Sequence, residues 1–452
     1  MGLEETLLQC LIRLVSVVTE ADHRGDIPRI HEEYFVERLE KDDVSATTLS
    51  ASFEKQEVPN SFVVYRLVED TIKGEASFQE AIAELERLRK DLQPATILWQ
   101  LTRVFDLIAM MVLDSSQDLT SEESLRHVSK KVFHDLTSEK SVWTLKAVLT
   151  GLTITNSVKV GDLLSFSIID TKETLRKIPI YSLMTPPEYL PPSLRKGGVI
   201  MEISGESQLT LDLQERVQEL LQLLRLFRVG SVSSSHVMLI PDSYLGFSSS
   251  QYNSQTIPLA VSYAFNEEDA KPFERFVRDF ERILKLVRKG SNPALGPLVI
   301  GISRYNSALL ESKSYETRIV DVISALEAIL LDDNQELRYK LSMRTAGLLQ
   351  SFTEDPTEVL KSVSLAYEIR SLYLHGHKAK ASTAELKAVA DGILEWCRKV
   401  LLISLKMMPP IGHDAFVKRV DDALVDPKKM TTLREEITNS DIHTLVSKTP
   451  RG

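Results

Sequence analysis

Regularly spaced apolar residues predict helices over much of the chain. One stripe near the N-terminus consists of Leu7, Leu8, Leu11, Ile12 and Val15, and two longer patterns of the same kind follow within residues 78–114. The stretch 40–62 is polar with little periodicity, which predicts a loop containing a short strand near residues 62–65. We therefore expect a mostly helical region over residues 1–140.

After Trp143 the apolar positions change to a strand-like pattern. Strands are predicted at residues 145–149, 153–155, 163–169, 199–203 and 237–240, and the stretch 257–261 is also strand-prone. Gly151, Asn156 and Gly161 supply turns. A helix is predicted from about Leu211 to Phe227. Residues 141–266 thus read as a mixed α/β middle domain.

From Lys271 onward the pattern is helical. Apolar faces predict helices at 273–287 and 319–330, a third from Leu337 with Asn334 as its N-cap, and a fourth at 359–375 ended by Gly376. Ser382 and Glu385 have the spacing of a capping box, which predicts a fifth, long helix. Residues 267–410 therefore predict a helical bundle, followed by a partly mobile C-terminal tail at 411–452 with a weak helix around 414–424. The predicted fold class is α+β, mostly α.

Composition and charge limit the cellular location and the binding partners that we expect. The net charge is −10, but residues 271–410 hold 21 Lys+Arg against 17 Asp+Glu, so only this part has the sign that RNA prefers. Two cysteines exclude a disulfide framework and a Cys-rich zinc site. The N-terminus is a poor secretory signal, and no stretch of about 18 apolar residues predicts a membrane span. A cytoplasmic protein without membrane attachment is expected.

Motif searches exclude several kinds of chemistry. The chain has no phosphate-binding Gly-rich loop, no nucleophile elbow and no His-Glu-x-x-His sequence. Its nine histidines are scattered, and His375 with His377 would need a third ligand from elsewhere to bind a metal. We expect neither a metal nor a cofactor.

The segment Arg370-Ser-Leu-Tyr-Leu-His375 carries the strongest chemical signal. Its Arg and His are about 7.5 Å apart along a helix axis and roughly 140° apart around it, so they converge only near the helix end or across a symmetric interface. A histidine can move a proton to or from the 2′-hydroxyl or the leaving 5′-oxygen of RNA. A guanidinium can stabilise charge on the phosphate. The pair therefore predicts metal-independent RNA cleavage.

Residues 315–406 resemble the HEPN superfamily, in particular its ApeA-like group, and the middle domain resembles the region preceding such domains more weakly. The similar pieces are 323–331, 339–349 and 368–376. The resemblance implies a ribonuclease site lined by Arg370 and His375 at a homodimer interface, with a possible role in phage defence or a toxin system and a corresponding protein partner. It also implies that Glu327 and Arg344 lie beside the site. Ser371 stands where the family often has Asn, Asp or His.

Alternative interpretations remain open for each residue. Other family members only bind or scaffold, so a catalytically inactive HEPN protein with an RNA-binding or regulatory role is the alternative function. Arg370 could pair with Glu327 or Glu368, Arg344 could be the partner of Glu327, and His375 could cap its helix. Tyr367 and Tyr373 could stack on bases or pack in the bundle. A weak RNA-phosphate track, or simply a solvated helix face, is predicted at Arg282, Lys285, Arg288 and Lys289.

Overall fold

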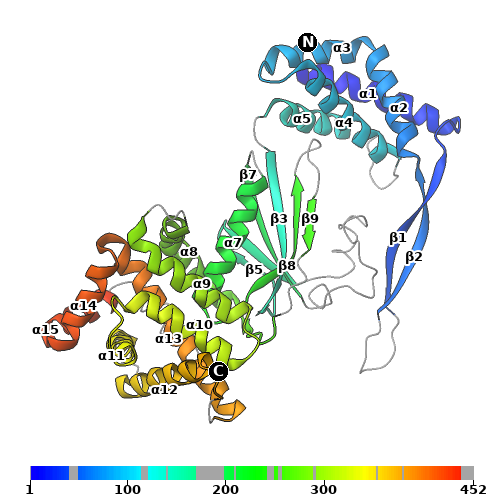
Figure 1. The fold of residues 1–452 in the computed structure, drawn as a ribbon. Coiled ribbons are helices and arrows are strands. Elements are labelled where there is room, and N and C mark those ends of the chain that lie inside the picture. Colours follow the sequence, from blue (N-terminus) through cyan, green and yellow to red (C-terminus); the bar gives the residue numbers. More distant parts are fainter. Residues whose placement is uncertain are drawn as a thin grey trace.

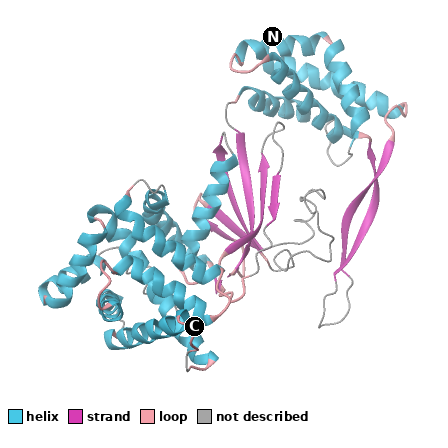
Figure 2. Cartoon of the chain, viewed as in Figure 1, coloured by secondary structure: helices cyan, strands magenta, loops and turns pink. Residues whose placement is uncertain are grey.

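A computed structural model shows a mostly helical protein with an antiparallel sheet in its middle, which confirms the predicted fold class (Figure 2). The structure describes residues 2–39, 49–113, 121–138, 141–168, 198–207, 210–241, 249–252, 257–288, 292–352, 355–378 and 381–438. Buried apolar side chains form two clusters, one within residues 3–136 and one within residues 145–437. The predicted boundary at residue 140 lies between the clusters, whereas the one at 266 lies inside the second.

The first cluster belongs to a group of helices at the N-terminal end (Figure 1). These helices are α1 (Leu3–His23), α2 (Ser61–Gly74), α3 (Ala76–Leu88), α4 (Pro94–Leu113) and α5 (Glu122–Thr137). The predicted stripe of α1 faces this core through Leu7, Leu8 and Leu11, although Ile12 is exposed. Residues 62–65 lie in α2, not in the predicted strand, because Asn60 accepts hydrogen bonds from the Phe62 and Val63 amides and starts a helix.

A long antiparallel hairpin extends from these helices (Figure 1). It is formed by β1 (Arg29–Leu39) and β2 (Leu49–Pro59), which pair in register along their whole length, from Arg29 with Pro59 to Leu39 with Leu49. The polar composition of residues 49–59 predicted a loop. Pairing of the backbone overrode that local preference, as strand formation depends on context.

The middle of the chain forms a six-stranded antiparallel sheet in the order β5-β6-β7-β3-β8-β9. Its strands are β3 (Ser141–Thr150), β5 (Val158–Val160), β6 (Leu164–Ile168), β7 (Val199–Ser207), β8 (Ser233–Pro241) and β9 (Ser249–Tyr252). Two further short strands, β4 (Leu152–Thr153) and β10 (Tyr263–Ala264), pair in parallel. The predicted strands at 145–149, 199–203 and 237–240 are confirmed, whereas residues 257–261 form a turn.

One face of the sheet packs on helices. Leu145, Ala147 and Leu149 alternate along β3 toward the second core, opposite Ile203, Met201 and Val199 of β7. Helices α7 (Thr210–Phe227) and α8 (Glu267–Arg288) contact the strands and contribute to this core (Figure 1). The same cluster continues into the C-terminal helices, so the sheet and these helices bury one continuous core.

The C-terminal helices are α9 (Gly296–Leu310), α10 (Tyr315–Leu330), α11 (Leu337–Leu349), α12 (Pro356–Leu374) and α13 (Thr383–Ile411), with single 3₁₀ turns at Pro293–Leu295 and Gln350–Phe352. Helix α9 was not predicted. The capping box of Ser382 and Glu385 is confirmed at the start of α13. Asn334 does not cap α11, because Glu336 occupies the N-cap position with a left-handed backbone (φ 51°).

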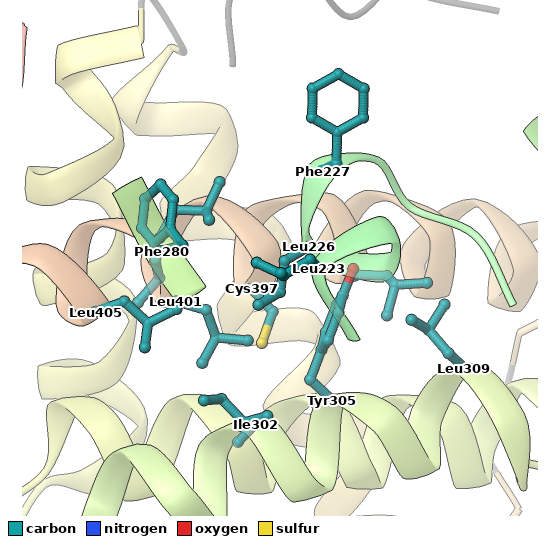
Figure 3. Packing of buried hydrophobic residues seen from close by; sticks show 14 of the residues in the cluster. Leu223, Leu226, Phe227, Phe280, Ile302, Tyr305, Leu309, Cys397, Leu401 and Leu405 are labelled. Carbon is teal, nitrogen blue, oxygen red and sulfur yellow. The ribbon is translucent and has the colours of Figure 1, made fainter. Parts of the chain in front are cut away.

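The carboxyl end of α7 is buried where the sheet meets these helices, and distant side chains bind all four of its last carbonyls. The Tyr263 hydroxyl donates to the Leu224 carbonyl (3.0 Å) and the Tyr305 hydroxyl to the Arg225 carbonyl (3.1 Å). Arg398 Nη1 donates to the carbonyls of Leu226 (2.9 Å) and Phe227 (3.0 Å). Figure 3 shows Tyr305 rising from α9 toward this end of α7. The Leu224 carbonyl also accepts from the Arg228 amide (3.3 Å), and the other three carbonyls are groups that a helix end leaves without intrahelical partners.

The weak helix predicted around 414–424 is confirmed, but residues 413–438 are packed helices and not a mobile tail. They form α14 (His413–Val425) and α15 (Pro427–Thr438), which bury Phe416, Val420 and Leu433 against the second core. The tail prediction for residues 439–452 lies outside the described residues. The turn into α14 is made at Gly412, whose φ of 82° favours glycine.

Helix α4 bears on the expectation that the chain has no membrane span. By length and composition it is apolar enough to cross a membrane, the single straight helix of this kind in the described ranges. The bent pair α13–α14 passes the same test when it is taken as one span. Ile97, Leu101, Phe105 and Ile108 of α4 are buried in the first core, so its apolar character also serves packing.

Candidate functional site

The carboxyl end of α12 carries the predicted Arg and His residues. Asp355 caps the start of this helix through the Thr357 amide, and Pro356 occupies its first turn. At the other end the His377 amide donates to the Leu372 carbonyl (2.8 Å) and the Gly376 amide to the Tyr373 carbonyl (3.0 Å). This is a Schellman motif, and it requires the positive φ of Gly376 (74°). His375 is therefore the C-cap residue, with an exposed side chain.

Arg370 forms an ion pair with Glu327 of α10. Its Nη2 donates one hydrogen bond to Glu327 Oε2 at 2.9 Å, and the two side chains are 23% and 18% exposed. The guanidinium also lies over the Tyr367 ring, 5.4 Å from its centroid, which is a cation–π contact. Arg370 Nε is buried and has no hydrogen-bond partner in the described part of the chain. The guanidinium thus keeps donors that its own chain does not use.

Burial controls the electrostatics of this pair. It raises the pKa of Glu327, while the charge of Arg370 and hydrogen bonding to Tyr367 act in the opposite direction. The pKa of Tyr367 is also raised, first by burial and then by the charge of Glu327. Tyr367 and Arg370 are three positions apart on α12, so one helix face presents both to the same carboxylate.

The structure does not bring Arg370 and His375 together within one chain. The guanidinium folds back over Tyr367, which lies one turn before it, whereas His375 lies five positions after it at the helix end. The contacts of Arg370 are with Glu327 and Tyr367. Any joint action of the two residues therefore requires Arg370 to move or a second copy of the chain to supply one of them.

Three other predicted residues surround the same helix end. Ser371 is half-buried, Tyr373 is 42% exposed and His377 is exposed. Leu374 is exposed as well, so the end of α12 offers apolar and polar groups together. This surface is open to a ligand or to another chain.

Arg344 is bound elsewhere. Its Nε and Nη2 donate to the two carboxylate oxygens of Asp421 (both 2.7 Å), and Nη1 donates to Asp332 (3.0 Å) and to the Leu330 carbonyl. These contacts join α11 to the end of α10 and to α14. Arg344 is not the partner of Glu327, a role taken by Arg370, and its donors are committed to the fold.

The predicted basic track receives little support from α8. Lys285 is bound to Glu281 (2.7 Å) and lies 3.8 Å from Glu219, so nearby carboxylates balance its charge. Arg282 is exposed. Lys289 and the side chain of Arg288 lie outside the described residues. In the same described ranges, no group of three or more His, Cys, Asp or Glu residues could hold a metal ion.

No family model matches the chain, and no curated protein and no solved structure shows significant similarity to it. The candidate site therefore stands on its own geometry. Sequence reasoning identified Arg370, Glu327 and His375 but left Tyr367 between base stacking and packing. Its position under the guanidinium could have been suspected from the three-residue spacing between Tyr367 and Arg370.

Proposed function

We propose that the protein is a metal-independent endoribonuclease whose site is built on the end of α12. The observation that carries this proposal is the incompletely bound guanidinium of Arg370 on the same helix end as the exposed His375. Buried arginines normally use their donors within the fold, so unused donors beside a histidine favour an anionic ligand. RNA is an anionic ligand whose cleavage can use both groups.

In the proposed reaction the 2′-oxygen of RNA attacks the adjacent phosphorus while the bond to the 5′-oxygen breaks. A proton leaves the 2′-hydroxyl and another reaches the departing 5′-oxygen, and His375 moves one of these protons. Arg370 binds the phosphate and stabilises the charge that develops on it. The products carry a 2′,3′-cyclic phosphate and a 5′-hydroxyl, and DNA, which lacks the nucleophile, is not cut.

We propose that two copies of the chain complete the site. The contacts of Arg370 are with Glu327 and Tyr367 and not with His375, and the exposed Tyr373 and Leu374 lie on the same helix end. A symmetric dimer in which the two α12 ends meet would place the Arg370 of one copy near the His375 of the other. The same arrangement is compatible with a non-catalytic scaffold, which the Arg370–Glu327 ion pair favours because it already gives Arg370 a structural contact.

Incubation with tRNA and total RNA in EDTA separates these functions. We expect cleavage by the wild type and none by His375→Ala or Arg370→Ala. His23→Ala and Arg304→Ala are matched controls, since His23 is also an exposed histidine in a last helical turn and Arg304 also pairs with a carboxylate of α10. Cleavage that survives in either site variant would contradict the ribonuclease proposal.

A further inference from the structure

The Glu327 carboxylate binds the guanidinium of Arg370, which is also the group that an RNA phosphate would bind. Carboxylates and phosphates accept hydrogen bonds from a guanidinium through similar geometry, so they compete for the same donors. We infer that Glu327 and Tyr367 hold Arg370 in a resting position, and that an RNA phosphate must displace the Glu327 carboxylate to bind the guanidinium. This inference rests on the proposed function and adds a regulatory role for two residues of the same site.

The contacts of Arg370 suit a group that can be released. A single hydrogen bond joins it to Glu327, and its Nε has no partner among the described residues. A buried donor left without a partner is unfavourable, and binding an anion removes that penalty. In contrast, each guanidinium nitrogen of Arg344 donates to a carboxylate or a carbonyl.

The position of the Arg370 guanidinium along α12 also fits a resting position. Tyr367 draws the guanidinium toward the middle of α12, whereas His375 is at the exposed end. Release from Tyr367 and Glu327 frees the long, flexible side chain to swing toward solvent and toward the helix end. Phosphate bound there would lie nearer to a histidine of either copy than the resting guanidinium does.

The resting pair is stable without substrate. Withdrawal of Arg370 would leave Glu327 as a buried carboxylate without its cation, which is unfavourable. Tyr367 stays hydrogen-bonded to that carboxylate and limits the penalty. Binding of RNA therefore has to compensate for the loss of the pair, so the wild type should bind RNA more weakly than a chain that lacks the Glu327 charge.

Binding of a 2′-O-methyl RNA oligonucleotide, which cannot be cleaved, tests this inference through fluorescence anisotropy. We expect Glu327→Gln to lower the dissociation constant on the order of tenfold, the effect of freeing one charge-assisted donor. The gain should vanish in the Glu327→Gln, Arg370→Ala double variant. Tyr367→Phe keeps the ring but removes the hydroxyl that limits the penalty on Glu327 after release, so it should weaken RNA binding slightly.

Asp321→Asn is the matched control. Asp321 is another partly buried carboxylate of α10, and it pairs with Arg304 (3.3 Å) on the neighbouring α9, so its loss should leave RNA binding unchanged. Unchanged or weaker binding by Glu327→Gln, with weaker binding by Arg370→Ala, would overturn the resting-position inference and leave the ribonuclease proposal intact. Wild-type binding by Arg370→Ala would overturn both.

Discussion

Arg344 on α11 and Arg370 on α12 both face the end of α10, yet the chain treats them differently. Arg344 is 3% exposed and donates to Asp421, Asp332 and the Leu330 carbonyl. Burial acts to lower the pKa of Arg344, but its hydrogen bonds to Asp421 and Asp332 outweigh burial and raise it. Arg370 donates one hydrogen bond to Glu327, is also hydrogen-bonded to Tyr367, and has an Nε without a partner among the described residues. An arginine whose guanidinium nitrogens all make hydrogen bonds stabilises the fold, whereas one with a nitrogen left over can bind a ligand.

A third arginine extends the comparison. Arg398 of α13 is fully buried, binds Glu395 through Nε (2.8 Å) and Nη2 (2.6 Å), and closes the end of α7. The ends of α9 and α10 are closed in the same way, by Arg318 on the Ala308 carbonyl and by His413 on the Ile329 carbonyl. The positive charges of Arg398 and Arg318 at the carboxyl ends of helices also match the helix dipole. Met has an unbranched side chain like Arg but carries no charge. Replacing Arg398, Arg344 or Arg370 by Met therefore measures how much each arginine contributes to stability and to RNA binding.

Arg398→Met should have the largest effect on stability. It removes the hydrogen bonds to Glu395 and leaves two helix-end carbonyls without their donor, and we expect the free energy of unfolding to fall by about 3–5 kcal/mol, as for other broken buried pairs. Urea unfolding followed by tryptophan fluorescence measures this, with Trp396 as a reporter in the same helix. Arg304→Met, at an exposed arginine, should change stability by less than about 0.5 kcal/mol.

Arg344→Met should have an intermediate effect. Asp332 and Asp421 are 40% and 46% exposed and can return to water, but the Leu330 carbonyl loses a donor. We expect a loss of about 2 kcal/mol, the scale of leaving one buried polar group unsatisfied. The same unfolding experiment measures it. RNA binding per folded molecule should equal that of the wild type, and a selective loss of binding would place Arg344 in the site after all.

Arg370→Met should destabilise the chain by no more than about 1 kcal/mol, because its pair is partly exposed and rests on one hydrogen bond. Its RNA binding and cleavage should nevertheless be lost. Calorimetry measures the stability of the variant, and fluorescence anisotropy measures its RNA binding. If stability fell as far as in Arg344→Met while RNA binding stayed unchanged, Arg370 would belong with the structural arginines.

The titration of Glu327 should have the smallest effect on the free energy of unfolding, and it should appear as a dependence on pH. Burial raises its pKa in the folded chain above the unfolded value, so the folded state binds the additional proton. Stability from this group is full below the ordinary Glu pKa and is lost as pH rises through the raised one. The stability of Glu327→Gln relative to the wild type should therefore increase with pH across that window. Parallel urea titrations at several pH values measure the trend, and a flat difference would contradict it.

The sequence was most informative where local patterns decide structure. The faces of α8, α10 and α13 and the Ser382–Glu385 box follow from spacing alone. Helix α9 escaped prediction because Gly296-Pro297 and Gly301 read as breakers. Gly301 is instead where α9 approaches α10 closely, since a Cβ there would lie 2.7 Å from Ile329. The hairpin strand at residues 49–59 escaped because its pairing, not its composition, makes it a strand.

At the candidate site, contacts between residues far apart in the sequence could not be predicted. The Glu327–Arg370 contact was one of several open pairings, and local spacing could not choose between Arg344, Arg370 and solvent for Glu327. The partner of Arg344 is Asp421, 77 positions away in the short helix predicted around 414–424, which was not expected to pack on the bundle. Tyr263, Tyr305 and Arg398 meet at the end of α7 only because the sheet and the helices share a core. Such convergence depends on the tertiary fold.

The chemistry of the RNA ends produced in EDTA tests the central proposal most directly. Wild type, His23→Ala and Arg304→Ala should generate new 5′-hydroxyl and 2′,3′-cyclic phosphate ends, because a histidine and a guanidinium promote attack by the 2′-oxygen without a metal. His375→Ala and Arg370→Ala, shown by calorimetry to be folded, should generate none. New ends of the same kind from either site variant, or 5′-phosphate ends from the wild type, would contradict the account.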